Sequence, residues 1–161
     1  SAVAERRAKV VGMSARRRNK IYQFSAAASL LLLLSVGTFW FANNNYSNFA
    51  LADNAFELTS NTKGQNTTIL TDFNRAEQAF SKGRYSEVID IYENIIATND
   101  NPTEVHLAEW NLANTQLAAG DVVNAKLMLE RIAGDNTHNY QDDAKALQSD
   151  LDSFWRSFTF Y

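Results

Sequence analysis

Two histidines are the only imidazole side chains of this chain, and imidazole is a common general base and metal ligand near neutral pH. His106 and His138 stand without an H-x-x-x-H or H-x-x-E-H pairing, so a zinc site would need ligands gathered from unrelated positions. The chain has no cysteine, which excludes disulfides, thiolate metal sites and cysteine nucleophiles. Its serines occur without a G-x-S-x-G turn, and it has no glycine-rich phosphate loop. We therefore expect a non-enzymatic protein with no catalytic residue, metal, cofactor or small-molecule substrate.

The carboxylates give no sign of a catalytic acid-base pair. Those nearest the C-terminus are spread along one predicted helix, where they read as a solvated face: Asp142, Asp143, Asp150 and Asp152. With a single proline and six glycines, the chain also lacks the turn density of a multi-stranded sandwich. We predict an all-α fold.

Charge divides the chain into distinct parts. Residues 1–20 hold seven basic residues against Glu5, a net charge of +6, while residues 43–161 have a net charge of −9. Between them, residues 21–42 carry no charge. The basic segment lacks the interleaved aromatic residues of a nucleic-acid-binding surface, so we expect contact with lipid headgroups and not with nucleic acid.

The uncharged residues 21–42 predict one transmembrane helix. As a helix, 22 residues extend about 33 Å, enough to cross a hydrocarbon core of about 30 Å. Basic residues precede this segment, which predicts a cytoplasmic N-terminus and a periplasmic C-terminal part in the inner (plasma) membrane. The expected membrane-interface residues are Arg16, Arg17, Arg18 and Trp40. A cleaved signal peptide is the alternative, with Ala50-Leu51-Ala52 as the cleavage site, but the apolar run is too long for one.

Beyond the span, residues 43–70 are rich in Asn, Ser and Thr and predict a polar spacer with one short helical turn near 50–57. Residues 71–161 then show apolar residues at helical spacing. The pattern predicts five helices, at 72–82, 85–97, 102–119, 122–133 and 140–158, with glycines 83, 120 and 134 in the turns.

The first two of these helices repeat in the next two at an offset of 37 residues. Ala76 corresponds to Ala113, and Gly83 to Gly120. The further pairs are Phe80 with Leu117, Val88 with Ala125, Tyr92 with Leu129, and Ile95 with Ile132. Small residues recur where helices must cross closely, and glycine recurs in the turn.

This pattern resembles the tetratricopeptide repeat, whose period is about 34 residues. The resemblance covers about residues 70–134, with the fifth helix as a C-terminal cap, and it implies a short solenoid that binds protein segments in a groove. Matching the groove pattern to this sequence gives Phe73, Glu77, Phe80, Ser81, Trp110, Asn114 and Leu117. Phe80, Trp110 and Leu117 are equally interpretable as core residues.

The whole arrangement is similar to single-pass bacterial envelope proteins of the Bacteroidota type and to a small periplasmic repeat protein that accompanies the bacterial secretion channel. These resemblances imply a membrane-anchored accessory or scaffold protein whose partners are the lipid bilayer and other protein subunits of a membrane or envelope complex. The alternative is the C-terminal sensing part of a transmembrane anti-sigma-like signalling protein, with its output domain upstream of Ser1.

The C-terminus, FWRSFTFY, contains five aromatic residues in eight. Ala144, Leu147, Leu151, Phe154 and Phe158 follow one helical stripe and are expected to be buried. Trp155, Phe160 and Tyr161 lie outside that stripe, so we expect them to contact a partner protein or the membrane interface. The alternative is that they fold back over the spacer near Phe49 and Phe56.

Overall fold

Helices form where the apolar periodicity predicts them. The computed structural model describes residues 29–57 and 67–159, and the regular elements within these residues are all helical. The all-α prediction is therefore confirmed. The chain divides into two compact units, residues 1–41 and 42–161.

The described part of the first unit, residues 29–41, is helical, and its leucines 30–34 are 60–73% exposed. Among the described residues, no helix is both long enough and apolar enough to cross a membrane. The first eight residues of the predicted span, 21–28, lie outside the described residues, as do Arg16, Arg17 and Arg18. Trp40 is 68% exposed.

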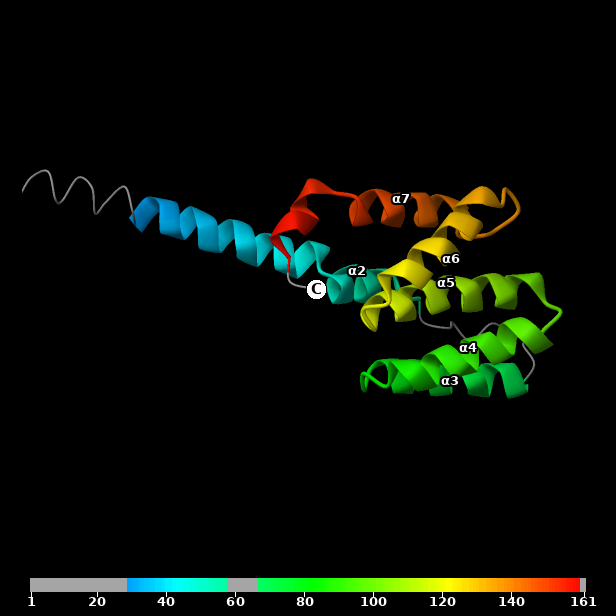
Figure 1. The fold of residues 1–161 in the computed structure, drawn as a ribbon. Coiled ribbons are helices and arrows are strands. Elements are labelled where there is room, and N and C mark those ends of the chain that lie inside the picture. Colours follow the sequence, from blue (N-terminus) through cyan, green and yellow to red (C-terminus); the bar gives the residue numbers. More distant parts are fainter. Residues whose placement is uncertain (1–28, 58–66, 160–161) are drawn as a thin grey trace, which may run out of the picture. The chain divides into compact units, whose positions relative to one another are not determined.

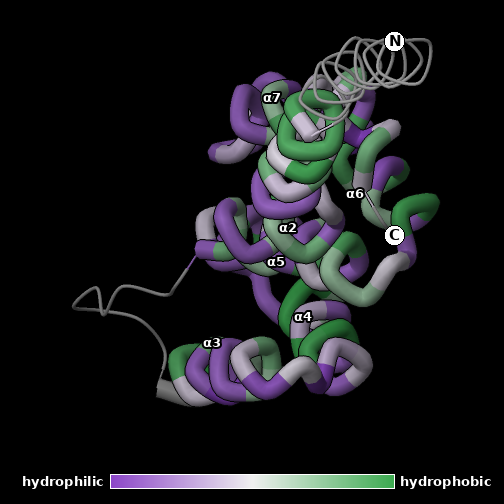
Figure 2. Tube along the Cα trace, turned by 90° about the vertical axis from the view of Figure 1, so that its left-hand side faces the viewer, coloured by the Kyte–Doolittle hydropathy of each residue, from purple (hydrophilic) through white to green (hydrophobic). Residues whose placement is uncertain are grey.

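From residue 48 on, the described residues of the second unit form six α-helices and one 3₁₀ helix (Figure 1). These are α2 (Asn48–Ala55), α3 (Thr67–Phe80), α4 (Tyr85–Thr98), α5 (Pro102–Ala118), α6 (Val122–Gly134), α7 (Gln141–Leu151) and η1 (Phe154–Phe158). Hydrophilic and hydrophobic residues are interspersed along these helices (Figure 2). Helices α3 to α7 pack in chain order, each against the next.

The two helix pairs share one turn geometry at the predicted offset. Gly83 and Gly120 adopt positive φ angles of 69° and 84°, which favour glycine. The N–H of Arg84 donates to the Ala79 carbonyl at 2.9 Å, and the N–H of Asp121 donates to the Gln116 carbonyl at 2.8 Å. These hydrogen bonds lie 37 residues apart, so the turn between α3 and α4 and the turn between α5 and α6 have the same hydrogen bond and the same glycine conformation.

The residues paired by the 37-residue offset are also equivalent in their burial. All the apolar residues paired by the offset are buried, from Ala76 and Ala113 to Ile95 and Ile132. They belong to two core clusters, one around α3 and α4 and one joining α5, α6, α7 and α2.

Helix α2 lies in the segment that the sequence predicts as a spacer. The Ser47 hydroxyl caps it by accepting the N–H of Ala50 at 3.2 Å. Leu51 and Ala52 then enter the core cluster of α5 and α7. The predicted short helical turn is therefore a two-turn helix that completes the core.

The predicted fifth helix ends earlier than expected. Helix α7 stops at Leu151, and Ser153 adopts an extended conformation and accepts the N–H of Trp155, which begins η1. Ser and Asp favour such caps over helix interiors. Ala144, Leu147 and Leu151 are buried as predicted, but Phe154 and Phe158 are exposed because the helical stripe is broken before them.

Candidate protein-binding groove

The central helix α5 is buried on every side over residues 110–117. It packs against α4, α6 and α2, so its polar residues must find partners inside the fold. This burial sets the geometry of the candidate site, which lies where α5 meets α2 and α7.

Two neighbouring side chains of α5 hold the end of α2 and the residues after it. The Trp110 indole Nε1 donates to the Ala55 carbonyl at 2.9 Å. The Asn111 amide makes two hydrogen bonds with the backbone of Glu57: Oδ1 accepts its N–H at 3.0 Å, and Nδ2 donates to its carbonyl at 2.8 Å. Helix α5 thus binds residues 55–57 through backbone groups, which any side-chain sequence could present.

Phe56 anchors this segment from within. Its ring stacks on Phe80 of α3 at 4.0 Å between centroids and lies 6.3 Å from Tyr92 of α4. Asn111 also donates to the Tyr92 hydroxyl at 3.3 Å. Burial raises the pKa of Tyr92, so this phenol stays protonated and can donate a hydrogen bond. The segment therefore bridges both core clusters.

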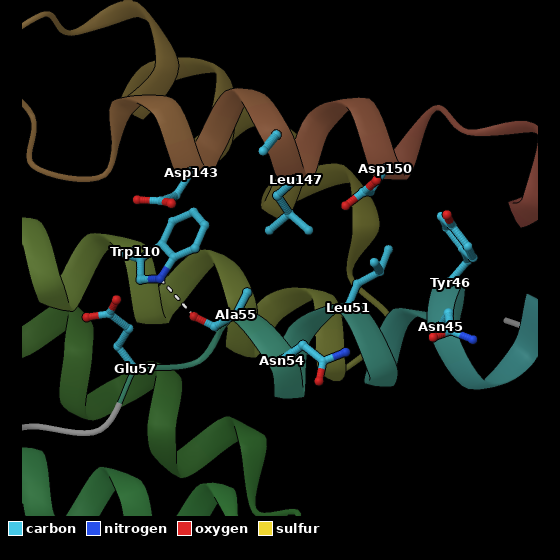
Figure 3. A pocket seen from close by; sticks show the side chains of 11 residues that line it. Asn45, Tyr46, Leu51, Asn54, Ala55, Glu57, Trp110, Asp143, Leu147 and Asp150 are labelled. Atoms are coloured by element: carbon cyan, nitrogen blue, oxygen red, sulfur yellow. Dashed lines mark hydrogen bonds between the residues drawn. The ribbon is translucent and has the colours of Figure 1, made fainter.

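A groove of about 450 Å³ remains open between α2 and α7 (Figure 3). Its apolar lining comes from Leu51, Ala55, Trp110, Ala146 and Leu147, and its polar lining from Asn45, Tyr46, Asn54, Glu57, Asp143 and Asp150. The charged residues in this lining are all acidic.

Tyr140 joins the groove to its surroundings. Its ring stacks on Trp110 at 5.4 Å with an interplanar angle of 2°, and its hydroxyl donates to Glu57 Oε2 at 2.9 Å. Burial, followed by the hydrogen bond to Glu57, raises the pKa of the Tyr140 phenol. The hydroxyl consequently remains a donor throughout the neutral range.

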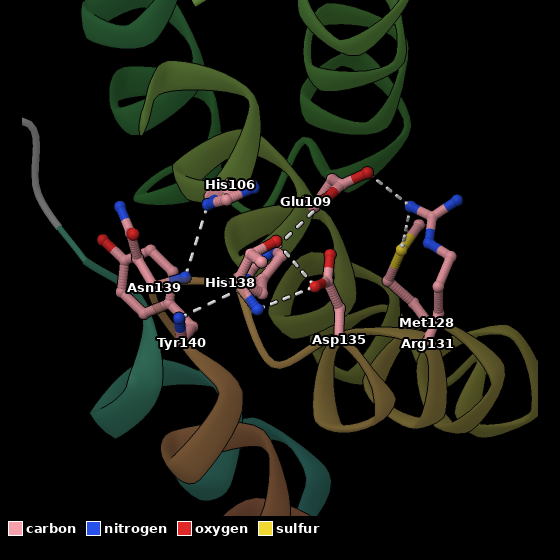
Figure 4. Close-up of polar contacts among 9 residues, drawn as sticks. His106, Glu109, Met128, Arg131, Asp135, His138, Asn139 and Tyr140 are labelled. Carbon is pink, nitrogen blue, oxygen red and sulfur yellow. Dashed lines mark hydrogen bonds and ion pairs between the residues drawn. The ribbon is translucent and has the colours of Figure 1, made fainter. Parts of the chain in front are cut away.

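The two histidines meet beside this region, where His138 in the turn before α7 lies against His106 of α5 (Figure 4). Their rings stack with centroids 4.1 Å apart. The N–H of Asn139 donates to His106 Nδ1 at 3.3 Å, and the N–H of Tyr140 donates to His138 Nδ1 at 3.1 Å. Both Nδ1 atoms therefore act as acceptors, which requires them to be unprotonated.

Charged groups surround the pair. Glu109 Oε2 lies 3.1 Å from His138 Nε2, and Glu109 Oε1 accepts from Arg131 at 2.7 Å. Burial lowers the pKa of His138, helped by His106, while Glu109 and Asp135 oppose the shift. Across the described residues, no three acidic or imidazole side chains are grouped to hold a metal ion. Backbone N–H groups of the turn before α7 thus hold both rings in place at α5.

The predicted groove residues differ in how deeply they are buried. Phe73 and Asn114 are fully buried and Trp110 nearly so, which leaves them in the core of this chain and not on an open surface. Asn114 donates to the Trp110 carbonyl at 2.9 Å, and its Oδ1 is buried with no hydrogen-bond partner. Glu77 is half-buried on α3. Of this set, Trp110 alone lines the groove.

Of the three C-terminal residues predicted to contact a partner or the membrane, the structure describes only Trp155. Trp155 is half-buried, and its ring lies 6.4 Å from that of Tyr46, so the tail folds back on the residues just before α2. Arg156 of the tail also donates to the Tyr46 carbonyl and to Asn48 Oδ1. Phe160 and Tyr161 lie outside the described residues.

Asn111, Phe56 and Tyr140 carry much of the site but were not predicted. The family pattern selects Asn114 on α5, one turn from Asn111, and residues 43–70 read as a spacer. One signal was available: residues 110–117 mix polar and apolar types without a single polar face, as expected of a helix covered on all sides.

No protein-family model, curated protein or solved structure matches this chain.

Proposed function

We propose that this chain is a non-enzymatic, membrane-anchored accessory or scaffold protein. Its helical unit, similar to a short tetratricopeptide array, binds a polypeptide segment of another subunit in the groove between α2 and α7. Residues 21–42 anchor it in the inner membrane with the helical unit in the periplasm.

The observation that carries the proposal is the way α5 already binds a polypeptide. Asn111 forms hydrogen bonds with both the N–H and the carbonyl of Glu57, and Trp110 donates a hydrogen bond to the Ala55 carbonyl. These hydrogen bonds show that α5 accommodates main chain, and Trp110 also lines the adjoining groove together with apolar and acidic side chains.

The repeat assignment is supported by the equivalent turns. Gly83 and Gly120 share their positive φ, and the hydrogen bonds that close the two turns correspond at the same offset. Stacked helix pairs of this kind leave concave surfaces for protein recognition.

Charge supports a basic partner segment. Glu57, Asp143 and Asp150 lie around the groove, in a part of the chain with a net charge of −9. Lysine and arginine side chains suit this arrangement because their aliphatic stems can cover the apolar floor while the charges meet the carboxylates.

The membrane anchor is supported by composition. Residues 21–42 carry no charge, and the helical leucines 30–34 are largely exposed. Exposed leucines at this density are costly in water and stable in hydrocarbon.

Site-specific photo-crosslinking in the cells that carry this protein tests the groove. A photoreactive side chain at Ala146, which lines the groove, is expected to give a discrete protein adduct. The same group at Leu127, which is exposed on α6, is the matched control and should give none. Asp143→Asn/Asp150→Asn should abolish the adduct at Ala146. Identical adducts at both positions, or an adduct that survives neutralisation, would contradict the groove assignment.

A further inference from the structure

The short helix η1 presents an aromatic cluster at the end of the described chain. Phe154, Trp155 and Phe158 contact one another with ring centroids 5.1–6.4 Å apart. Phe154 is 71% exposed and Phe158 is 39% exposed. Trp155 also stacks on Tyr46, at 6.4 Å.

This cluster is fixed to the beginning of the folded unit. Arg156, in the middle of η1, is buried and donates to the Tyr46 carbonyl at 3.2 Å and to Asn48 Oδ1 at 2.7 Å. Charge-assisted hydrogen bonds of this kind are stronger than neutral ones. The exposed rings are therefore held at a defined position next to residues 46–48.

Chain length places this position close to the proposed span. Tyr46 follows Ala42 by four residues, which cover at most about 14 Å even when fully extended. The headgroup region on each side of a bilayer is roughly 5–8 Å deep, taken from total and hydrocarbon thicknesses of about 40–45 Å and 30 Å. A span that ends at Ala42 thus keeps Tyr46, and the rings stacked on it, near the bilayer surface.

The charge pattern around the cluster fits lipid. Residues 42–52 carry no charged side chain, and Arg156 is the only charged residue in residues 153–161. The rest of the unit is strongly acidic, and anionic headgroups repel such surfaces. The cluster and the residues on which it stacks therefore bring no carboxylate of their own to a bilayer, and the flanking acids in sequence are Asp53 and Asp152.

We propose that Phe154, Trp155 and Phe158 insert into the headgroup interface of the bilayer as a second membrane contact. Tryptophan and tyrosine favour this depth because one part of each ring system is apolar and another part forms hydrogen bonds. Two contacts, the span and the aromatic cluster, hold the helical unit in one orientation on the membrane. This inference rests on the membrane anchor proposed above.

Tryptophan quenching by brominated phospholipids tests the contact in the full chain, reconstituted in vesicles of phosphatidylcholine and phosphatidylglycerol. The chain has three tryptophans, of which Trp110 is buried in the core and serves as the unquenched background. Trp40→Phe leaves Trp155 as the reporter, Trp155→Phe leaves Trp40, and the double variant leaves Trp110 alone.

The expected result is that both single variants are quenched and the double variant is not. Quenching of Trp155→Phe without quenching of Trp40→Phe would keep the anchor and overturn this inference. Quenching of the Trp40→Phe variant alone would show that lipid reaches Trp155 but not Trp40, which would support the aromatic contact and contradict the proposed transmembrane span. Absence of quenching in both single variants would overturn both the span and the aromatic contact. Protection of Trp155 from an aqueous quencher in native membranes but not in vesicles would identify a protein partner instead of lipid.

A surface substitution separates contact from folding. In the Trp40→Phe background, Phe154→Ser should reduce lipid quenching of Trp155 at an unchanged melting temperature, because Phe154 is largely exposed. Val123→Ser, at an equally exposed position on α6, should leave the quenching unchanged. Equal quenching in the two variants would contradict insertion of the cluster.

Discussion

The double hydrogen bond between Asn111 and Glu57 predicts a large difference between two asparagines of the same helix. Asn111 and Asn114 are both fully buried on α5. Asn111 makes three hydrogen bonds, two to Glu57 and one to Tyr92. Asn114 makes one, and its Oδ1 has no partner.

The substitutions Asn111→Ala and Asn114→Ala remove the same atoms from buried positions, so their cavity terms are similar. With about 1 kcal/mol for each net hydrogen bond, Asn111→Ala should cost about 3 kcal/mol in free energy of unfolding. Asn114→Ala removes one hydrogen bond but also a buried unsatisfied oxygen, which costs about 1–3 kcal/mol in the wild type. These effects offset each other, and we expect a cost below about 1 kcal/mol from hydrogen bonding.

Urea unfolding of residues 42–161, followed by far-UV circular dichroism, measures both variants, because this unit contains both core clusters. Asn111→Asp is a useful third variant, since it keeps the acceptor for the Glu57 N–H and loses the donor for the carbonyl. It should be destabilised as well. Equal costs for Asn111→Ala and Asn114→Ala would refute the view that Asn111 fastens the segment after α2.

Three further outcomes are expected. Ala113→Leu should overpack a close helix crossing and lower the free energy of unfolding by about 1–3 kcal/mol, while Lys126→Leu, which loses an exposed pair with Asp152, should cost less than about 1 kcal/mol. Stability should fall as the pH drops below 6.5, because burial lowers the pKa of His138 in the folded chain and the unfolded chain then binds a proton more readily. In thermal melts, His138→Gln should flatten this part of the pH profile. A reporter fused after Tyr161 should be active only outside the cytoplasm, and external protease should digest residues 43 onward in spheroplasts; protection of that region would reverse the topology.

The helices of the repeat region could be predicted because their signals are local. Apolar spacing and the glycines at 83 and 120 mark α4 to α6 within one residue of their observed ends, whereas α3 begins at Thr67, five residues before its predicted start and inside the predicted spacer. The offset of 37 residues also identified the buried positions, since equivalent packing requires equivalent side-chain sizes. No information from distant parts of the chain was needed.

The contacts of α2 could not be predicted in the same way. Its buried apolar side chains are Leu51 and Ala52, too few to give a clear helical stripe. Its position depends on Trp110 and Asn111, which lie more than fifty positions away and bind its backbone. The histidine pair escaped prediction for a related reason, because the turn before α7 brings His138 onto α5.

The position of α2 also explains why the family's groove pattern led to buried residues. Stacked helical repeats need neighbours to cover their faces, and two repeats have few. Within this chain α2 packs against α5 and α7 packs against α6, so the chain's own helices supply these neighbours. Trp110 is consequently a core residue that reaches the surface only at the groove beside α2. A partner that binds there must contact the chain's own α2 as one wall, so substitutions that loosen α2, such as Asn111→Ala, should weaken stability and partner binding together.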